Sequence, residues 1–508
     1  MAQAPIKRKV LRRFYEPLLL LSALGQIRGE RIKSESNTDT LSPNVHKLRR
    51  SFVDGIAYIC AYEKGPSRVT AVALEKTPQE IRVWLAANEK VQEKVIQFLE
   101  NVLSDIHRIS KLNDRESRQQ EGERTKEDLT SRVIAFNAPR IQIYYDQVAQ
   151  KHAPACLEII SEGHEGSGDR IARIGETHLA EWLRENFVTG TPSTPNSTKL
   201  QALVRTCYEN RRSPVFDTLK HLAGQGETRR LKFEQLYDLL CKLGKYVHIT
   251  KKLIEAAISL SQDFMEGFQI EALPSPKEQK LPLMSNEATV ESTIHRMFSS
   301  SEEQSKFMAR LQFIWDPSEL SELLQRQHNT KTRVHAELLL IDHFEKNGCN
   351  FLDGNDKYIG CSKPACYLCH AYITSHPGRY TVPASHQKLY VGWRLPDIDP
   401  KDPACAAQHK SQEQIIMKLI DWVRKDITTD IESRTSRLPY HADSTVGMTS
   451  TSKTLASKPD LLSSASSLYD VDTKAIDINR SETVDPQEVQ TQLDDSDISD
   501  DEGGVRLD

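Results

Sequence analysis

One stretch of the sequence combines residue types that bind metal ions and move protons. His335 and Glu337 stand at the start of an apolar-periodic segment, 334–347, which predicts a helix ended by Gly348. Side chains two apart inside a helix point in roughly opposite directions, so this pair can address one site only from the helix start. The pattern by itself is weak, because a His-x-Glu triplet often occurs by chance.

Two cysteines follow at a spacing that strengthens the prediction. Cys366 and Cys369 stand in the first turn of a second predicted helix, 365–375. Side chains three apart share one helix face, and the positive end of the helix dipole favours the thiolate that a metal ion needs. A Cys-x-x-Cys pair alone would fit a redox pair, a structural zinc or a catalytic zinc. Together with His335, it predicts one metal site shared by two helix starts.

The number of ligands decides what such a site can do. Three protein ligands, His335, Cys366 and Cys369, would leave the fourth position of a tetrahedral zinc open for water, as in catalytic sites. Glu337 would then handle the protons of that water. Cys361 leaves an alternative open, because a fourth protein ligand would close the site and make the zinc purely structural. We expect the open site, since Cys361 stands at a strand end, well before Cys366.

The combined pattern resembles the signature of zinc deaminases. Val-His-Ala-Glu-Leu at 334–338 and Gly-Cys-Ser-Lys-Pro-Ala-Cys-Tyr-Leu-Cys at 360–369 are similar to the cytidine-deaminase-like superfamily. In detail they resemble a nucleic-acid-deaminase-like family that is expanded in fungi and also present in some intracellular bacteria. The resemblance covers residues 331–395. It departs from the family pattern at Ala365, which separates Pro364 from the first cysteine of the pair.

The resemblance implies a hydrolytic deaminase with one zinc ion per chain, acting on a cytosine or adenine base in nucleic acid or in a nucleotide. Zinc-bound hydroxide would attack the amine-bearing ring carbon, and Glu337 would be the catalytic proton shuttle. Asn88 would bind the substrate, and Tyr358 and Tyr367 would either stack on the base or serve as packing residues. The side chains expected beside the ligands are Cys361 and His370.

Two other functions remain open. The chain could be an inactive deaminase-like module whose zinc holds the fold while a helical segment binds a protein partner, or it could carry a purely structural zinc site. Glu337 favours catalysis, because it has no evident structural role. The net charge of residues 331–425 is only +3, which neither supports nor excludes single-stranded nucleic acid as the substrate.

The elements around the motif predict an α/β (α+β) fold. A helix at 48–62 precedes a hairpin of strands 68–75 and 81–86, and short strands are expected at 357–361 and 389–393. The resemblance implies a three-layer mixed sheet flanked by helices, with the hairpin and the zinc helices in one core. A long helical insertion would split that core. This hypothesis requires pairing between the hairpin and the strand at 357–361.

The chain is therefore divided into five parts. They are a basic N-terminal segment (1–44), the first part of the deaminase-like core (45–89), an all-helical insertion (90–329), the zinc-binding core (330–429) and a disordered acidic tail (430–508). The insertion begins with a helix at 91–109 and a polar connector at 110–131, and a closing helix is expected at 415–427. The tail carries a net charge of −10, and the rest of the chain carries +6.

Composition excludes several classes of protein. The 508 residues contain no apolar run of about 18 residues, which excludes a membrane-spanning helix. Nine cysteines, an odd number spread over a long chain, argue for a reducing compartment and against a disulfide framework. The basic N-terminus lacks the long apolar run and clear cleavage site of a signal peptide. We expect an intracellular protein, cytoplasmic or nuclear, without membrane contact.

Overall fold

The computed structural model describes residues 6–25, 32, 43–162, 170–188, 197–224, 227–283, 289–327, 329–354 and 356–434. All of them belong to one compact unit. The predicted acidic tail lies outside the described residues from 435 onward. Its predicted start at 430 is wrong, because residues 430–433 still belong to the helix α17 (Cys405–Ser433). The division into domains stays a prediction.

A four-stranded mixed sheet, in the order β3-β2-β1-β6, joins parts of the chain that are far apart in sequence. β1 (Thr70–Lys76) and β2 (Ile81–Ala87) form the expected antiparallel hairpin. β1 also pairs antiparallel with β6 (Gly360–Cys361), with Ala71 opposite Cys361. This is the pairing that the split-core hypothesis required.

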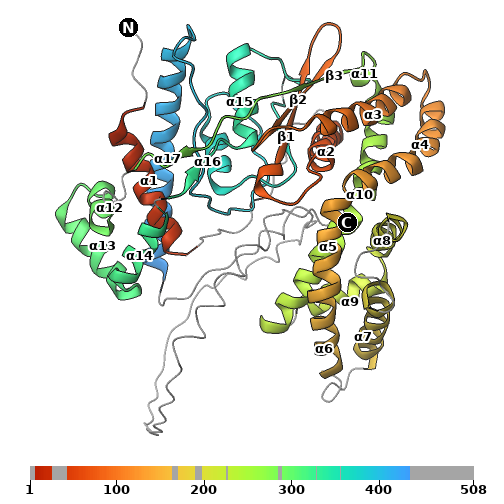
Figure 1. Ribbon diagram of the computed structural model, residues 1–508, viewed down its shortest axis with the longest axis horizontal. Helices are drawn as coiled ribbons and strands as arrows, with labels where there is room; N and C mark the ends of the chain where they lie inside the picture. The colour runs from red at the N-terminus through yellow and green to blue at the C-terminus, as the bar shows by residue number, and fades with distance from the viewer. Residues whose placement is uncertain are drawn as a thin grey trace, which may run out of the picture. The chain divides into compact units, whose positions relative to one another are not determined.

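The two faces of the sheet are covered by different helices. Side chains on β1 and β2 alternate between two hydrophobic cores, as the two-residue period of a strand requires. The core on one face includes α2 (Pro43–Cys60), and the core on the other face includes α15 (Ala336–Asn347). Figure 1 shows β1 and β2 between these two helices. The structure is thus the expected mixed α+β fold, with three layers at its centre.

The region predicted as an all-helical insertion also contains strands, which corrects that prediction. β3 (Phe268–Ala272) pairs in parallel with β2, from Ile81 opposite Phe268 to Leu85 opposite Ala272. β4 (Gln279–Lys280) pairs with β5 (Lys331–Thr332). These strands are short, and their hydrogen-bonding partners lie far away in the sequence. The local pattern of apolar and polar residues therefore gives little indication of these strands.

The predicted polar connector at 110–131 is wrong, because most of it lies in α4 (Arg115–Phe136). The Asp114 side chain caps this helix by accepting a hydrogen bond from the backbone N–H of Ser117 at 2.8 Å. The exposed face carries ion pairs such as Lys126–Glu123, and Leu129 and Val133 on the other face are buried. A charged exposed face made this amphipathic helix look like a linker.

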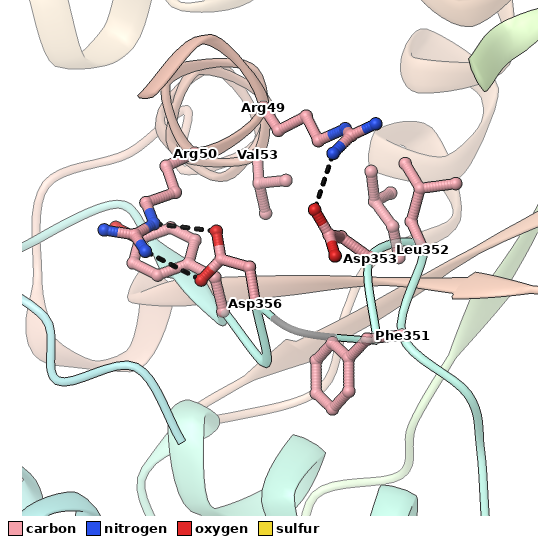
Figure 2. Close-up of a pocket in the computed structure, with 9 residues that line it drawn as sticks. Arg49, Arg50, Val53, Phe351, Leu352, Asp353 and Asp356 are labelled. Carbon is pink, nitrogen blue, oxygen red and sulfur yellow. Dashed lines mark hydrogen bonds and ion pairs between the residues drawn. The ribbon is translucent and has the colours of Figure 1, made fainter. Parts of the chain in front are cut away.

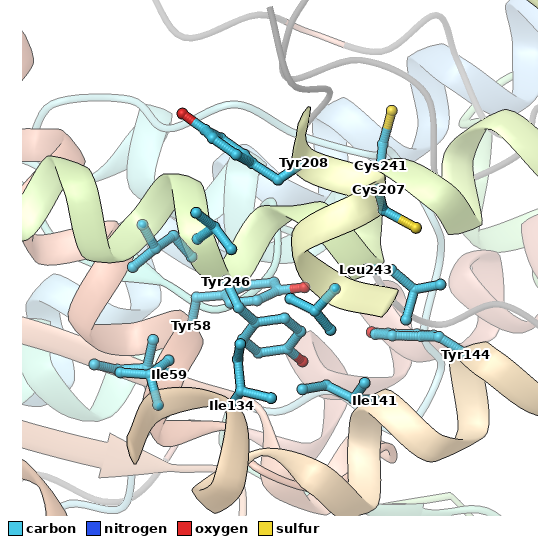
Figure 3. Packing of buried hydrophobic residues seen from close by; sticks show 14 of the residues in the cluster. Tyr58, Ile59, Ile134, Ile141, Tyr144, Cys207, Tyr208, Cys241, Leu243 and Tyr246 are labelled. Atoms are coloured by element: carbon cyan, nitrogen blue, oxygen red, sulfur yellow. The ribbon is translucent and has the colours of Figure 1, made fainter. Parts of the chain in front are cut away.

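The helical region packs around the long helix α10 (Glu227–Ser259). Figure 3 shows Tyr246 and Cys241 of α10 with Tyr58 of α2 and Cys207 of α8. Cys207, Cys241 and Cys156 are buried, as expected of ordinary core residues. The other helices of this region are α3 (Glu93–Ser110), α5 (Ala138–Gln147), α6 (Ala153–Glu162), α7 (Arg170–Leu183), α8 (Ser197–Asn210), α9 (Pro214–Leu222) and α11 (Ser261–Phe264).

The second core contains the helix that positions the cysteine pair, α16 (Tyr367–Ser375), together with α15, α17 and the N-terminal helix α1 (Arg8–Ala23). α1 lies beside α17 (Figure 1), and its leucines at 18–21 are buried.

The strand predicted at 389–393 is wrong, because only an isolated bridge joins Trp393 to Arg333. The remaining helices are α12 (Val290–Met297), α13 (Ser301–Ile314) and α14 (Pro317–Gln327). None of the described helices combines the length and apolar character that crossing a membrane requires.

Candidate metal centre

The start of α15 directs two functional side chains to one place. His335 is the N-cap residue and has extended backbone angles, φ −77° and ψ 153°, whereas Glu337 lies in the first helical turn. Because only Glu337 has helical geometry, the two side chains are not forced to opposite sides of the helix. Gly348 ends the helix in the left-handed conformation with φ 61°, as predicted.

The start of α16 supplies the two sulfur atoms. Cys366 is the N-cap residue, and its Sγ accepts a hydrogen bond from the backbone N–H of Cys369 at 3.4 Å. The Nδ1 atom of His335 lies 3.6 Å from Cys366 Sγ and 3.3 Å from Cys369 Sγ. All three potential ligand atoms lie within 4.8 Å of one another. The structure therefore brings together the three side chains predicted as ligands.

These distances fit a zinc ion. With Zn–S bonds of about 2.3 Å and Zn–N bonds of about 2.0 Å, tetrahedral geometry separates a nitrogen and a sulfur ligand by ~3.6 Å. Within the described part of the chain, no other group of three His, Cys, Asp or Glu side chains could hold a metal ion, and Cys361 is not a member of this group. The arrangement supports three protein ligands and an open fourth position.

The electrostatics of the cluster suit a cation. Burial would raise the pKa of the Cys366 thiol, but hydrogen bonds from Cys369 and the charge of His335 hold that pKa well below its usual range. Burial would lower the pKa of His335, but Cys366 and Glu337 outweigh it and raise that pKa. Burial raises the pKa of Cys369, and the neighbouring Cys366 adds to the effect. The cluster thus holds one thiolate readily, and a metal ion would stabilise the second.

The comparison with protein families singles out this same region. Residues 334–397 match the model of the OTT_1508_deam-like deaminase family. The segment is similar to a deaminase family of the cytidine-deaminase-like superfamily. The match includes His335, Glu337, Cys366 and Cys369, and it confirms the resemblance found in the motifs. Neither the curated proteins nor the solved structures give a match to the chain.

The deaminase-like segment, residues 334–397, is fastened to α2 by ion pairs. Arg50 binds the Asp356 carboxylate through two nitrogens, both at 2.8 Å, and Arg49 Nη1 lies 2.6 Å from Asp353 Oδ2 (Figure 2). The Asp54 carboxylate accepts hydrogen bonds from the Tyr358 hydroxyl at 2.9 Å and from the Cys361 N–H at 3.2 Å. These contacts hold the chain just before the cysteine pair.

A cavity of about 330 Å³ lies beside the ligand cluster. Glu337 lines it and is only 4% exposed, and its Oε2 lies 3.8 Å from Cys369 Sγ. Sequence reasoning missed several cavity residues, which are Lys331, Arg333, Lys363, His386 and Tyr390. The Tyr390 ring lies 6.1 Å from the His335 ring, and the His386 ring lies 6.0 Å from the Tyr390 ring. Their closeness in sequence to the two motifs was the one available signal, since Lys331, Arg333 and Lys363 precede the cysteine pair and His386 and Tyr390 follow it.

The other predicted residues have different surroundings. Tyr358 contacts Asp54, and the Tyr367 hydroxyl donates to Asp426 Oδ2 at 2.6 Å, so neither tyrosine lines the cavity. These contacts favour the packing alternative for both tyrosines. His370 is buried, and its ring lies 6.2 Å from the Trp422 ring on α17. Asn88 does line the cavity.

Proposed function

We propose that the chain is a zinc-dependent hydrolytic deaminase of an amine-bearing nucleobase. The observation that supports this most directly is the position of Glu337, whose carboxyl group lines the cavity beside three ligands that leave a fourth position open. Burial raises the pKa of this carboxyl group. A purely structural zinc site has no use for a buried carboxyl group beside its ligands. Such an environment is typical of a proton-transfer residue.

The roles of the side chains follow from this geometry. When held by His335, Cys366 and Cys369, zinc would act as a Lewis acid and lower the pKa of a water in its fourth position toward ~7. Glu337 accepts a proton from the attacking water and passes it to the ring nitrogen. The new C–O bond forms, and the remaining proton of the added hydroxyl group would then pass through Glu337 to the amine. The C–N bond breaks, ammonia leaves and a ring carbonyl remains.

The cavity lining indicates how a substrate would bind. Tyr390 and His386 offer flat rings against which a base can pack. Lys331, Arg333 and Lys363 line the same cavity. Lys331 and Arg333 also pair with Glu278, so these side chains offer a phosphate group a partly compensated positive charge. We therefore propose a phosphate-bearing substrate, either a free nucleotide or single-stranded nucleic acid.

The test combines metal analysis with ammonia release. The purified chain should contain one zinc ion and should release ammonia from at least one of cytidine, adenosine, their monophosphates, single-stranded DNA and RNA. Glu337→Gln should keep the zinc and abolish ammonia release. Glu345→Gln, on the same helix but hydrogen-bonded to Tyr380, is the matched control and should stay active. Activity that survives Glu337→Gln would contradict the proposed mechanism.

The alternative is a zinc-holding module without activity that binds a protein partner through the helical region. It predicts that the zinc-loaded chain releases no ammonia from any of these substrates, and that Glu337→Gln leaves the affinity for the partner unchanged. The same assays therefore separate the two functions.

A further inference from the structure

The side chain of Asn88, at the end of β2, is engaged by the protein itself. Its Oδ1 accepts a hydrogen bond from the backbone N–H of Ala336 at 2.9 Å, across 248 residues of sequence. Its Nδ2 donates to the backbone oxygen of Pro66 at 2.8 Å. Asn88 is only 7% exposed. Its amide therefore joins two walls of the cavity.

The Ala336 N–H is one of the first amides of α15, which have no partner inside the helix. An N-cap side chain normally accepts a hydrogen bond from one of these amides. His335 occupies the N-cap position but makes no such bond, and its ring faces the cysteine sulfurs instead. At α16, by contrast, Cys366 caps its own helix. A ligand that cannot cap its helix needs an outside acceptor, and Asn88 is that acceptor.

Asn88 is itself held in place by the segment that follows β3. The Ser275 hydroxyl lies 2.7 Å from the backbone oxygen of Ala87 and 2.6 Å from that of Glu89. These carbonyls flank Asn88 on both sides. The backbone N–H of Asn88 donates to the Val69 oxygen at 3.1 Å. Hydrogen bonds through Ser275 and Asn88 thus connect the segment after β3 with the start of α15.

We propose that Asn88 is a positioning residue that caps α15 from outside and so sets the places of His335 and Glu337, and that Ser275 holds Asn88 in this role. The effect on turnover rests on the proposed function. The effects on the helix start and on metal affinity do not, since they need no substrate.

Hydrogen exchange of the full chain, with zinc removed and with zinc bound, tests the cap directly. Asn88→Ala should speed exchange in peptides that cover 334–340, and Ser275→Ala should do so to a smaller extent. Asn88→Asp keeps an acceptor for the Ala336 N–H but loses the donor to the Pro66 oxygen, so its 334–340 peptides should exchange more slowly than those of Asn88→Ala. Asn101→Ala is the matched control, because the exposed Asn101 amide bonds only within its own helix, to Gln97.

Zinc affinity, measured by competition with a chelator, gives a second readout. Asn88→Ala should weaken zinc binding about tenfold, the effect typical of residues that orient a metal ligand, whereas Asn88→Asp should weaken it less. Where activity is present, Asn88→Ala should lower kcat and leave KM unchanged.

A different result would overturn the proposal. If Asn88→Ala leaves both the exchange of 334–340 and the zinc affinity unchanged and raises KM alone, Asn88 is a substrate-binding residue. If Asn88→Ala does not fold, hydrogen exchange of 334–340 and zinc affinity are measured on Ser275→Ala instead. The proposal is overturned if both are the same in Ser275→Ala as in the parent chain. A parent chain without deaminase activity would contradict the proposed function but leave both readouts intact.

Discussion

The Nδ1 atom of His335 lies 3.3 Å from the Sγ atom of Cys369, although 34 residues separate them in the sequence. The two residues stand at the starts of α15 and α16, and β6 lies between these helices in the chain. Their separation is close to the ~3.6 Å expected for two ligands of one zinc ion. The sheet and the two helix starts thus bring two of the predicted ligands to a separation that fits one metal ion.

Replacing a ligand should remove the metal. Cys369→Ala leaves only two protein ligands, so the zinc content measured after dialysis should fall close to zero, and the midpoint of thermal unfolding should fall with it. Cys361→Ala is the control, because Cys361 is not a member of the ligand cluster. It should keep one zinc ion per chain. Loss of zinc in Cys361→Ala would mean that the site is closed by four ligands.

Tyr390 should affect substrate binding without affecting the metal. Tyr390→Ala removes an aromatic wall of the cavity, and a stacked base contributes roughly 1–3 kcal/mol, so KM should rise about tenfold or more. Zinc content should not change. Tyr390→Phe keeps the ring and should bind substrate nearly as well, and Tyr358→Phe, outside the cavity, should leave KM unchanged. An unchanged KM in Tyr390→Ala would refute the placement of the base.

The ion pair between Arg50 and Asp356 should contribute strongly to stability. The Asp356 side chain is 4% exposed and that of Arg50 is 13% exposed, so Asp356→Ala leaves a buried guanidinium without its carboxylate. The free energy of unfolding, measured with urea, should fall by about 3 kcal/mol. Glu322→Ala removes an exposed ion pair with Arg326 and should cost less than about 0.5 kcal/mol. Equal losses in the two variants would contradict this account.

Asp54 should make stability depend on pH in an unusual direction. Burial raises its pKa from 3.8 to about 6, against the hydrogen bond from Tyr358 and the charge of Lys245. A carboxyl group whose pKa is raised by folding destabilises the protein above that pKa, and this cost disappears as pH falls from 6 toward 4. Relative to Asp54→Asn, the parent chain should gain about 1.3 kcal/mol between pH 7 and pH 5.

Urea unfolding of both proteins at the two pH values measures this difference. Using the difference removes the contributions of titrating groups that do not interact with Asp54. The buried Lys245, whose pKa is lowered by burial and raised in part by the charge of Asp54, is an exception. A parent chain that loses stability relative to Asp54→Asn over this interval would show that folding lowers the pKa of Asp54.

The sequence by itself determined the local part of the site. The apolar period of α15, its Gly348 stop and the spacing of Cys366 and Cys369 are properties of single helices, so the ligands and Glu337 could be found from short segments. The pattern of the hairpin was equally local, because β1 and β2 are neighbours in the chain.

Only the tertiary structure decided what depends on contacts between distant segments. β3 becomes a strand because it pairs with β2, and Tyr390 reaches the cavity although no strand forms around it. Asn88 accepts a hydrogen bond from Ala336, although 248 residues separate the two in the sequence. Such contacts leave no periodic trace, because hydrogen bonds and packing between distant segments depend on the positions of both partners in space. The types of the predicted ligands could therefore be inferred from the sequence. The cavity and the groups that position those ligands could not.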